Sequence, residues 1–136
     1  MKNKTILLLI FIALVSCNKV ESALQGGWLI EKVYYNNKPV IYDLYSNSFD
    51  LKKDNTCWLP SSAMNENQAG VETGTWESYS IDTISYLKIK SVNKIFNRTF
   101  RVLNFRKEMD NKKYGYLLKM TLVADSLKMI CEKVPY

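Results

Sequence analysis

The sequence predicts an all-β fold: an antiparallel up-and-down meander closed into a barrel of about eight strands, preceded by a cleaved signal peptide. Three observations lead to this prediction. Apolar and polar residues alternate with a period of two through most of residues 26–136, short turn-forming clusters separate the alternating segments, and the composition is globular, with 47% hydrophobic and 12% aromatic residues. An open sheet of this size would leave two exposed edges, and closure into a barrel removes both.

The first 16 residues have the pattern of an export signal. Lys2 and Lys4 precede an unbroken apolar run at residues 6–15. That run is too short to cross a bilayer core of ~30 Å, which needs about 20 helical residues, but it fits the apolar region of a signal peptide. Residues 14–17 (LVSC) resemble the bacterial lipobox, which implies cleavage before Cys17 and acylation of its thiol. The alternative is an ordinary cleaved signal followed by a chance cysteine.

We therefore expect removal of residues 1–16, a lipidated tether at residues 17–25 and a barrel domain at residues 26–136. Acyl chains on Cys17 would hold the domain at a membrane in the cell envelope. Asn18 follows the cysteine where an aspartate would favour the inner membrane, so by resemblance to enterobacterial sorting we expect the outer membrane, facing the periplasm. The formal net charge of +6 falls to +4 without the leader, a surplus that solubility explains.

The expected strands are short segments in which apolar and polar side chains alternate between turn formers. The first strand is rich in aromatic and branched residues, which favours a strand. In the seventh, Tyr114, Tyr116, Leu118, Met120 and Leu122 share one face, so we expect that face to be buried. In chain order the expected strands are residues 27–35, 48–53, 56–59, 71–81, 83–91, 97–106, 114–123 and 127–134.

Turn chemistry separates these strands. Asp54 and Asn55 tolerate left-handed backbone and form local hydrogen bonds, so they predict a hairpin. Pro60 ends the second strand of that hairpin, because proline donates no hydrogen bond to a ladder. Residues 61–70 form one long polar loop, which is either functional or a solvated insertion. Residues 40–45 fit a short strand or a helical turn.

Three short motifs recur in one known group of domains. Gly26 and Trp28 form a Gly-x-Trp start, residues 49–56 (FDLKKDNT) resemble a hairpin of the form F-x-x-D-G-T with Asn55 in place of glycine, and residues 74–77 (GTWE) resemble an internal G-T-W strand. The chain thus resembles bacterial lipoproteins with a lipocalin-like (calycin) domain, of the Bacteroidetes type. The resemblance implies an antiparallel meander barrel, often hollow, in which Trp28 plugs the closed end. It implies no particular ligand.

The residue inventory argues against catalysis. The chain has no histidine, which excludes Ser-His-Asp triads, Cys-His dyads and most zinc sites. The carboxylates are scattered, without the spacing of a glycosidase pair. We therefore expect no enzymatic activity, no metal and no cofactor. Nucleic acid is not an expected partner, because the chain is exported and its basic residues are spread over many strands.

Two sets of residues are candidates for a function or a covalent link. Cys57 and Cys131 remain once Cys17 is acylated, and they form either a disulfide or two buried free thiols. A set of large apolar residues on inward faces lines either a pocket or a solid core. That set is Trp28, Trp76, Tyr116, Leu118, Met120 and Met129.

Two functions are compatible with these sequence features. In the first, which follows family analogy, the membrane-anchored barrel binds a small hydrophobic ligand in the cell envelope. In the second, the interior is packed and the chain is a non-enzymatic protein-interaction module, such as an inhibitor, an immunity protein or an assembly factor, that meets an envelope protein through residues 61–70 or a basic face. An enclosed void of about 300 Å³ or more would favour the ligand.

Overall fold

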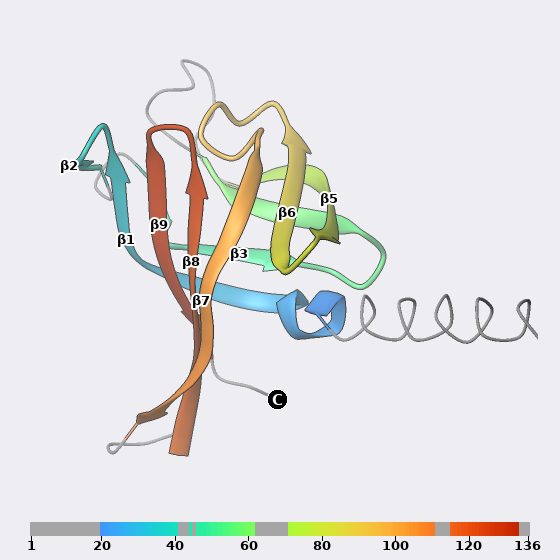
Figure 1. The fold of residues 1–136 in the computed structure, drawn as a ribbon. Helices are drawn as coiled ribbons and strands as arrows, with labels where there is room; N and C mark the ends of the chain where they lie inside the picture. The colour runs from blue at the N-terminus through green and yellow to red at the C-terminus, as the bar shows by residue number, and fades with distance from the viewer. Residues whose placement is uncertain (1–19, 41–43, 45, 62–70, 111–114, 134–136) are drawn as a thin grey trace, which may run out of the picture.

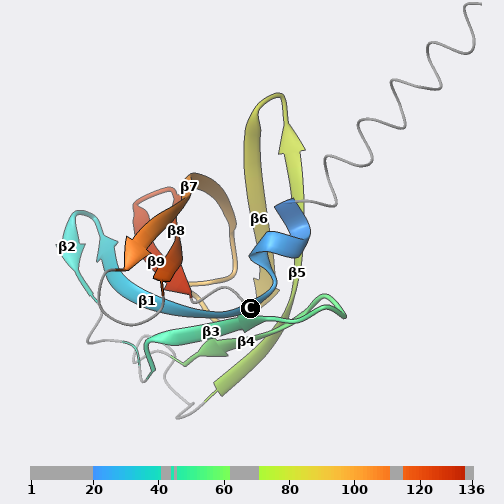
Figure 2. The same ribbon diagram turned by 90° about the horizontal axis from the view of Figure 1, so that it is seen from below.

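The computed structural model describes residues 20–40, 44, 46–61, 71–110 and 115–133. These residues form one antiparallel sheet that closes on itself, as Figures 1 and 2 show from two directions. The strands are β1 (Gly26–Tyr35), β2 (Lys38–Pro39), β3 (Ser48–Leu51), β4 (Thr56–Pro60), β5 (Val71–Ile81), β6 (Ile84–Ser91), β7 (Thr99–Asp110), β8 (Gly115–Ala124) and β9 (Leu127–Lys133).

Closure of the barrel comes from the pairing of the first long strand with the last. The sheet runs β2-β1-β3-β4-β5-β6-β7-β8-β9, and β1 also pairs with β9, from Leu29 opposite Glu132 to Tyr35 opposite Leu127. Eight strands therefore make the barrel, and β2 is an extra strand that folds back on β1. The predicted fold class, a closed antiparallel meander, is confirmed.

The turns form where short polar side chains allow left-handed backbone. Asn55, which stands where the lipocalin-like motif has glycine, adopts a φ of 63°, and Asp125 between β8 and β9 adopts 48°. Asp54 holds the first of these turns, because its carboxylate accepts hydrogen bonds from the backbone N–H and the hydroxyl of Thr56. The hairpin predicted at Asp54 and Asn55 is thus present, and in both turns an Asn or Asp residue fills the left-handed position.

The barrel interior is filled by inward side chains from every long strand and by one connection. In the segment between β6 and β7, Ile95 and Phe96 turn into the barrel, and the ring of Phe96 lies 5.9 Å from that of Phe49. The buried side chain of Asn93 fixes this segment by accepting from the N–H groups of Ile95 and Phe96 and donating to the carbonyl of Pro60. The alternating pattern did not predict this contribution, because it comes from a connection.

The two ends of the barrel differ. At the end that we call distal, the turns after β1 and β8 meet, since the N–H of Asn36 donates to the carbonyl of Ser126 at 3.0 Å. Arg98, just before β7, lies 4.0 Å from Asp125 at the same end. The opposite end, which we call proximal, holds the start of β1, the end of β9 and the turn between β3 and β4.

The segment that enters the barrel is packed and not a free tether. Residues 20–24 are helical, and Leu24 is fully buried against the proximal end. The indole N–H of Trp28 donates to the carbonyl of Leu24 at 2.7 Å. Residues 20–25, the described part of the expected tether, therefore form a structured cap on the barrel. The described residues contain no apolar helix of the length that a bilayer crossing requires.

Candidate functional site

Four of the six residues predicted to line a pocket meet in the barrel interior. At most 2% of the side-chain surface of Trp28, Trp76, Met120 or Met129 is accessible to water. A void large enough for a water molecule would expose the side chains that border it, so these four residues border no such void. In the described part of the barrel they form a solid core, which is the alternative that the sequence left open.

The other two predicted lining residues lie at the proximal rim of the barrel. Leu118 is partly buried against the core, and Tyr116 is 37% exposed. These two residues are less buried because β8 is longer than β9. The last residue of β9, Lys133, lies opposite Leu118, so β9 does not reach Tyr116. The buried face predicted for the seventh strand thus holds for Met120 and Leu122 and is lost toward Tyr116.

Trp28 closes the proximal end, which is the position that the lipocalin-like resemblance implies. Its ring is buried among the core residues and contacts the ring of Phe105 edge-on, with centroids 6.1 Å apart. The ammonium of Lys133 lies 4.7 Å from the indole and donates to the carbonyls of Ala23, at 2.6 Å, and Gln25. Burial lowers the pKa of Lys133 to about 8.

Cys57 and Cys131 are buried free thiols. They sit on β4 and β9, which are separated by β3 and β1 in the sheet, so the disulfide that the sequence left open does not form. Burial raises the pKa of the Cys57 thiol to about 11 and raises that of Cys131 as well. A thiol is nucleophilic only as the thiolate, so neither cysteine is suited to reaction near neutral pH.

A concavity across β1, β3 and β4 opens to solvent, and its floor is formed by buried core residues that include Trp28 and Phe49. It is an open groove of about 530 Å³. Two large apolar side chains are exposed on it, Trp58 at 50% and Leu29 at 43%. The residues that line it are Gly26, Gly27, Trp28, Leu29, Ser46, Ser48, Phe49, Asp50, Trp58, Leu59, Pro60, Glu132 and Lys133.

The groove follows from how β3 and β4 pair. Their ladder holds only two residue pairs, Asp50 with Trp58 and Leu51 with Cys57. It stops before Pro60, which has no N–H to donate. Gly27 leaves further space, because a Cβ added there would meet no atom within 4 Å.

Trp58 faces outward because its neighbours in β4 face inward. Cys57 and Leu59 are both buried, and side chains alternate along a strand. The ammonium of Lys52 lies 3.5 Å from the centroid of the Trp58 ring, so the exposed ring carries a cation on one face. Trp58 was not among the residues predicted to line a site. Cys57, Trp58 and Leu59 are all apolar, so the sequence alone did not show which of them faces outward.

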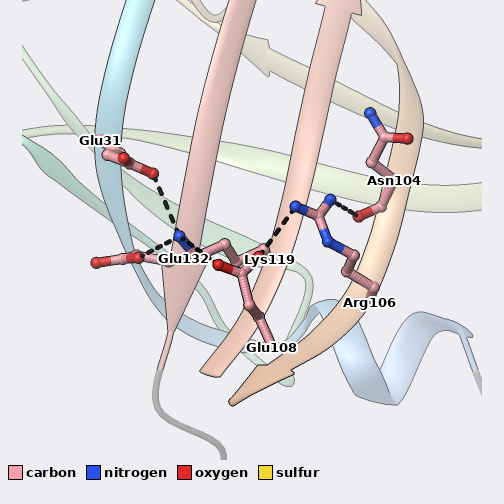
Figure 3. Close-up of polar contacts among 6 residues, drawn as sticks. All are labelled: Glu31, Asn104, Arg106, Glu108, Lys119 and Glu132. Atoms are coloured by element: carbon pink, nitrogen blue, oxygen red, sulfur yellow. Dashed lines mark hydrogen bonds and ion pairs between the residues drawn. The ribbon is translucent and has the colours of Figure 1, made fainter. Parts of the chain in front are cut away.

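A charged cluster borders this region on the outer faces of β1, β9, β8 and β7. The ammonium of Lys119 lies 3.4 Å from Glu132, 3.5 Å from Glu108 and 3.7 Å from Glu31, as Figure 3 shows. Partial burial would lower the pKa of Lys119, but the three carboxylates outweigh it and raise the pKa. Glu132 also lines the groove, so the cluster gives one wall of the groove a negative character.

Two predicted functional segments lie outside the described residues: Cys17, and residues 62–70 of the long polar loop. Within the described ranges, no group of three or more Cys, Asp or Glu side chains is arranged to hold a metal ion. Comparison of the chain with family models, with curated proteins and with solved structures finds no match. The groove and the filled interior are therefore the features of the described chain that bear on its function.

Proposed function

We propose that this chain is a lipid-anchored, non-enzymatic binding module of the lipocalin-like type, whose barrel is packed and whose partner is an envelope protein. The partner would bind in the outer groove of β1, β3 and β4. One observation carries this proposal. The interior residues Trp28, Trp76, Met120 and Met129 leave no room for a ligand, whereas Trp58 and Leu29 are exposed on an open concavity.

The groove has the properties of a protein-binding surface. Tryptophan is enriched among the residues that dominate protein interfaces, particularly where neighbouring contacts exclude water from it. Trp58 and Leu29 supply the apolar centre, and Asp50, Glu132 and Lys52 supply charges around it. Charges at the rim of an interface favour the correct partner over others and fix its orientation.

Photo-crosslinking in the native envelope tests this proposal. A photoreactive residue at Ser48, inside the groove, is expected to capture one reproducible protein partner. The same residue at Arg101 is the matched control, because β7 lies across the barrel from β3 and Arg101 is exposed. In the Ser48 variant, adding Trp58→Ala is expected to reduce the product at least severalfold, and adding Trp58→Phe is expected to retain it. Equal products from the two positions, or a product that does not depend on Trp58, would contradict the proposal.

A small hydrophobic ligand is the competing function, and the groove volume lies within the ~300–1,000 Å³ range of small-molecule sites. Native mass spectrometry after gentle extraction separates the two functions. A protein partner predicts the mass of the lipidated chain, alone or with a second polypeptide, and no bound small molecule. A bound apolar molecule that Trp58→Ala displaces would favour the ligand.

The lipid anchor is part of the same proposal. We infer that Cys17 is acylated and that the domain is held at the outer membrane, facing the periplasm, on the strength of residues 14–17 and Asn18. Metabolic labelling with a palmitate analogue is expected to mark the wild-type chain and not the Cys17→Ala variant.

Deletion of residues 62–69 tests whether the polar loop takes part in binding the partner. An unchanged crosslink at Ser48 would identify that loop as a connector only.

A further inference from the structure

One hairpin projects beyond the barrel at its proximal end. The last pair between β8 and β9 is Leu118 with Lys133, so β8 extends past β9 toward Gly115. There β8 pairs with β7, from Lys107 opposite Leu118 to Asp110 opposite Gly115. Figure 1 shows this end of the hairpin reaching below the rest of the barrel. We call residues 107–109 and 115–118 the overhang.

The overhang exposes the continuation of the barrel's inner face. Residues directly opposite each other in a ladder share a face, and Met109 lies opposite Tyr116. Tyr116 is on the same side of β8 as Met120, which is buried in the core. The side of β7 and β8 that is buried inside the barrel therefore continues beyond the end of β9, where nothing in the described chain covers Met109, which is 75% exposed.

The opposite face of the overhang is charged. Arg106 bonds to Glu108 at 3.0 Å, and Glu108 belongs to the cluster around Lys119 (Figure 3). On the apolar face, the ammonium of Lys107 lies 4.8 Å from the centre of the Tyr116 ring. Tyrosine with a lysine over its ring suits the interfacial layer of a bilayer, where the ring is half-buried and the ammonium reaches headgroups.

The overhang lies at the end of the barrel that the lipid would hold. The helical segment that starts at Val20 is fixed to this end, because Lys133 donates to the carbonyls of Ala23 and Gln25. Val20 is three residues along the chain from Cys17, and an extended chain spans at most about 3.6 Å per residue. A lipid on Cys17 would therefore keep the start of the helix within about 11 Å of the lipidated residue.

We propose that the overhang is a second membrane contact, with Met109 and Tyr116 seated in the interfacial layer of the bilayer that holds the anchor. This inference rests on the proposed acylation of Cys17. Together the two contacts fix the barrel's orientation, with the proximal end on the membrane and the distal turns facing away from it. The acyl chains on Cys17 would hold the domain at the bilayer, and the second contact would fix how the barrel is oriented there.

The test uses the full lipidated protein in vesicles of phosphatidylethanolamine and phosphatidylglycerol. An environment-sensitive fluorophore is attached to Met109→Cys and, in a separate sample, to Val92→Cys. Val92 is the matched control, since it is 73% exposed and lies between β6 and β7 near the distal end. The buried thiols Cys57 and Cys131 stay unlabelled in the folded protein, so the fluorophore reports one position.

We expect the probe at residue 109 to shift to the blue on vesicles and to be quenched severalfold more by spin-labelled lipid than the probe at residue 92. Protein that floats with the vesicles but shows equal quenching at both positions overturns the overhang contact and leaves the anchor standing. A blue shift at residue 109 already present in detergent-free buffer before vesicles are added also overturns it, because another part of the chain or a second copy then covers the face. If the protein does not float with the vesicles, the proposed lipid anchor is wrong, and so is the overhang contact that depends on it.

Discussion

Gly74 is the position where the closeness of two strands can be tested most directly. It lies in β5, in the G-T-W motif, opposite Cys57 on one side and Ser91 on the other. A Cβ added there would lie 2.5 Å from the carbonyl oxygen of Lys90 and 2.8 Å from the Cβ of Ser91. Ordinary contact begins near 3.4 Å, so Gly74→Ala requires β5 and β6 to separate locally by about 1 Å.

The expected loss follows from these distances. Overpacking in a core costs about 1–3 kcal/mol, and here the obstacle is backbone, which yields less than a side chain. Replacing glycine by alanine recovers about 0.4–1 kcal/mol by restricting the unfolded chain. Gly74→Ala should therefore lower the free energy of unfolding by about 1–2 kcal/mol, which corresponds to a Tm lower by about 4–8 °C for a domain of this size.

Gly27→Ala is the control for Gly74→Ala. Gly27 is also a strand glycine, but an added Cβ meets no atom within 4 Å. We expect its Tm to be unchanged or a few degrees higher, because only the restriction of the unfolded chain remains. Thermal unfolding followed by circular dichroism compares the two variants with the parent. Equal Tm values for both variants would show that the close β5–β6 contact does not lower the stability of Gly74→Ala.

Three further predictions concern titratable groups. Burial lowers the pKa of Lys133 to about 8 from 10.5, so between these values this side chain binds more protons in the unfolded chain, and its own contribution to the free energy of unfolding rises with pH; urea titrations should therefore show the parent gaining stability relative to Lys133→Met as the pH rises from about 8 toward 10.5. Lys119→Met leaves three carboxylates without their shared cation and should lower the free energy of unfolding by about 1–2 kcal/mol, whereas Lys119→Arg should not. The loss should be smaller at high salt, and a loss that salt does not change would point to packing instead. Cys57 and Cys131 should resist a thiol reagent near neutral pH until denaturant is added, and rapid labelling of the folded protein would show that their burial is wrong.

Much of the fold could be predicted because successive side chains of a strand point to opposite faces, so the alternation of polar and apolar residues shows which face is buried. The alternation of Met120, Leu122, Met129 and Cys131 identified the inner face of β8 and β9 correctly. The structured cap at residues 20–24 and the plug formed by Ile95 and Phe96 were missed. Both are short segments whose positions are set by contacts with strands, some of them far away in the sequence, so no local period marks them.

The candidate site was harder to predict, for a physical reason. Alternation shows which side chains point inward, but whether a barrel is hollow depends on the sum of the volumes that meet inside it. Phe96 enters from a connection and Trp28 caps one end, and neither contribution can be read from the period of the strands. The groove beside Trp58 depends on where the β3–β4 ladder stops, which is a property of two strands together.

The pairing of β1 with β9 has a consequence for biosynthesis. The ribosome makes β1 first and β9 last, so one edge of β1 has no native partner until residues 127–133 have been made. Contacts between such distant parts of a chain form late and slowly. If residues 1–16 direct export as proposed, a nascent chain that stays unclosed through translation would suit passage through an export channel. Any product that stops before Leu127 would keep two open edges on which copies can aggregate.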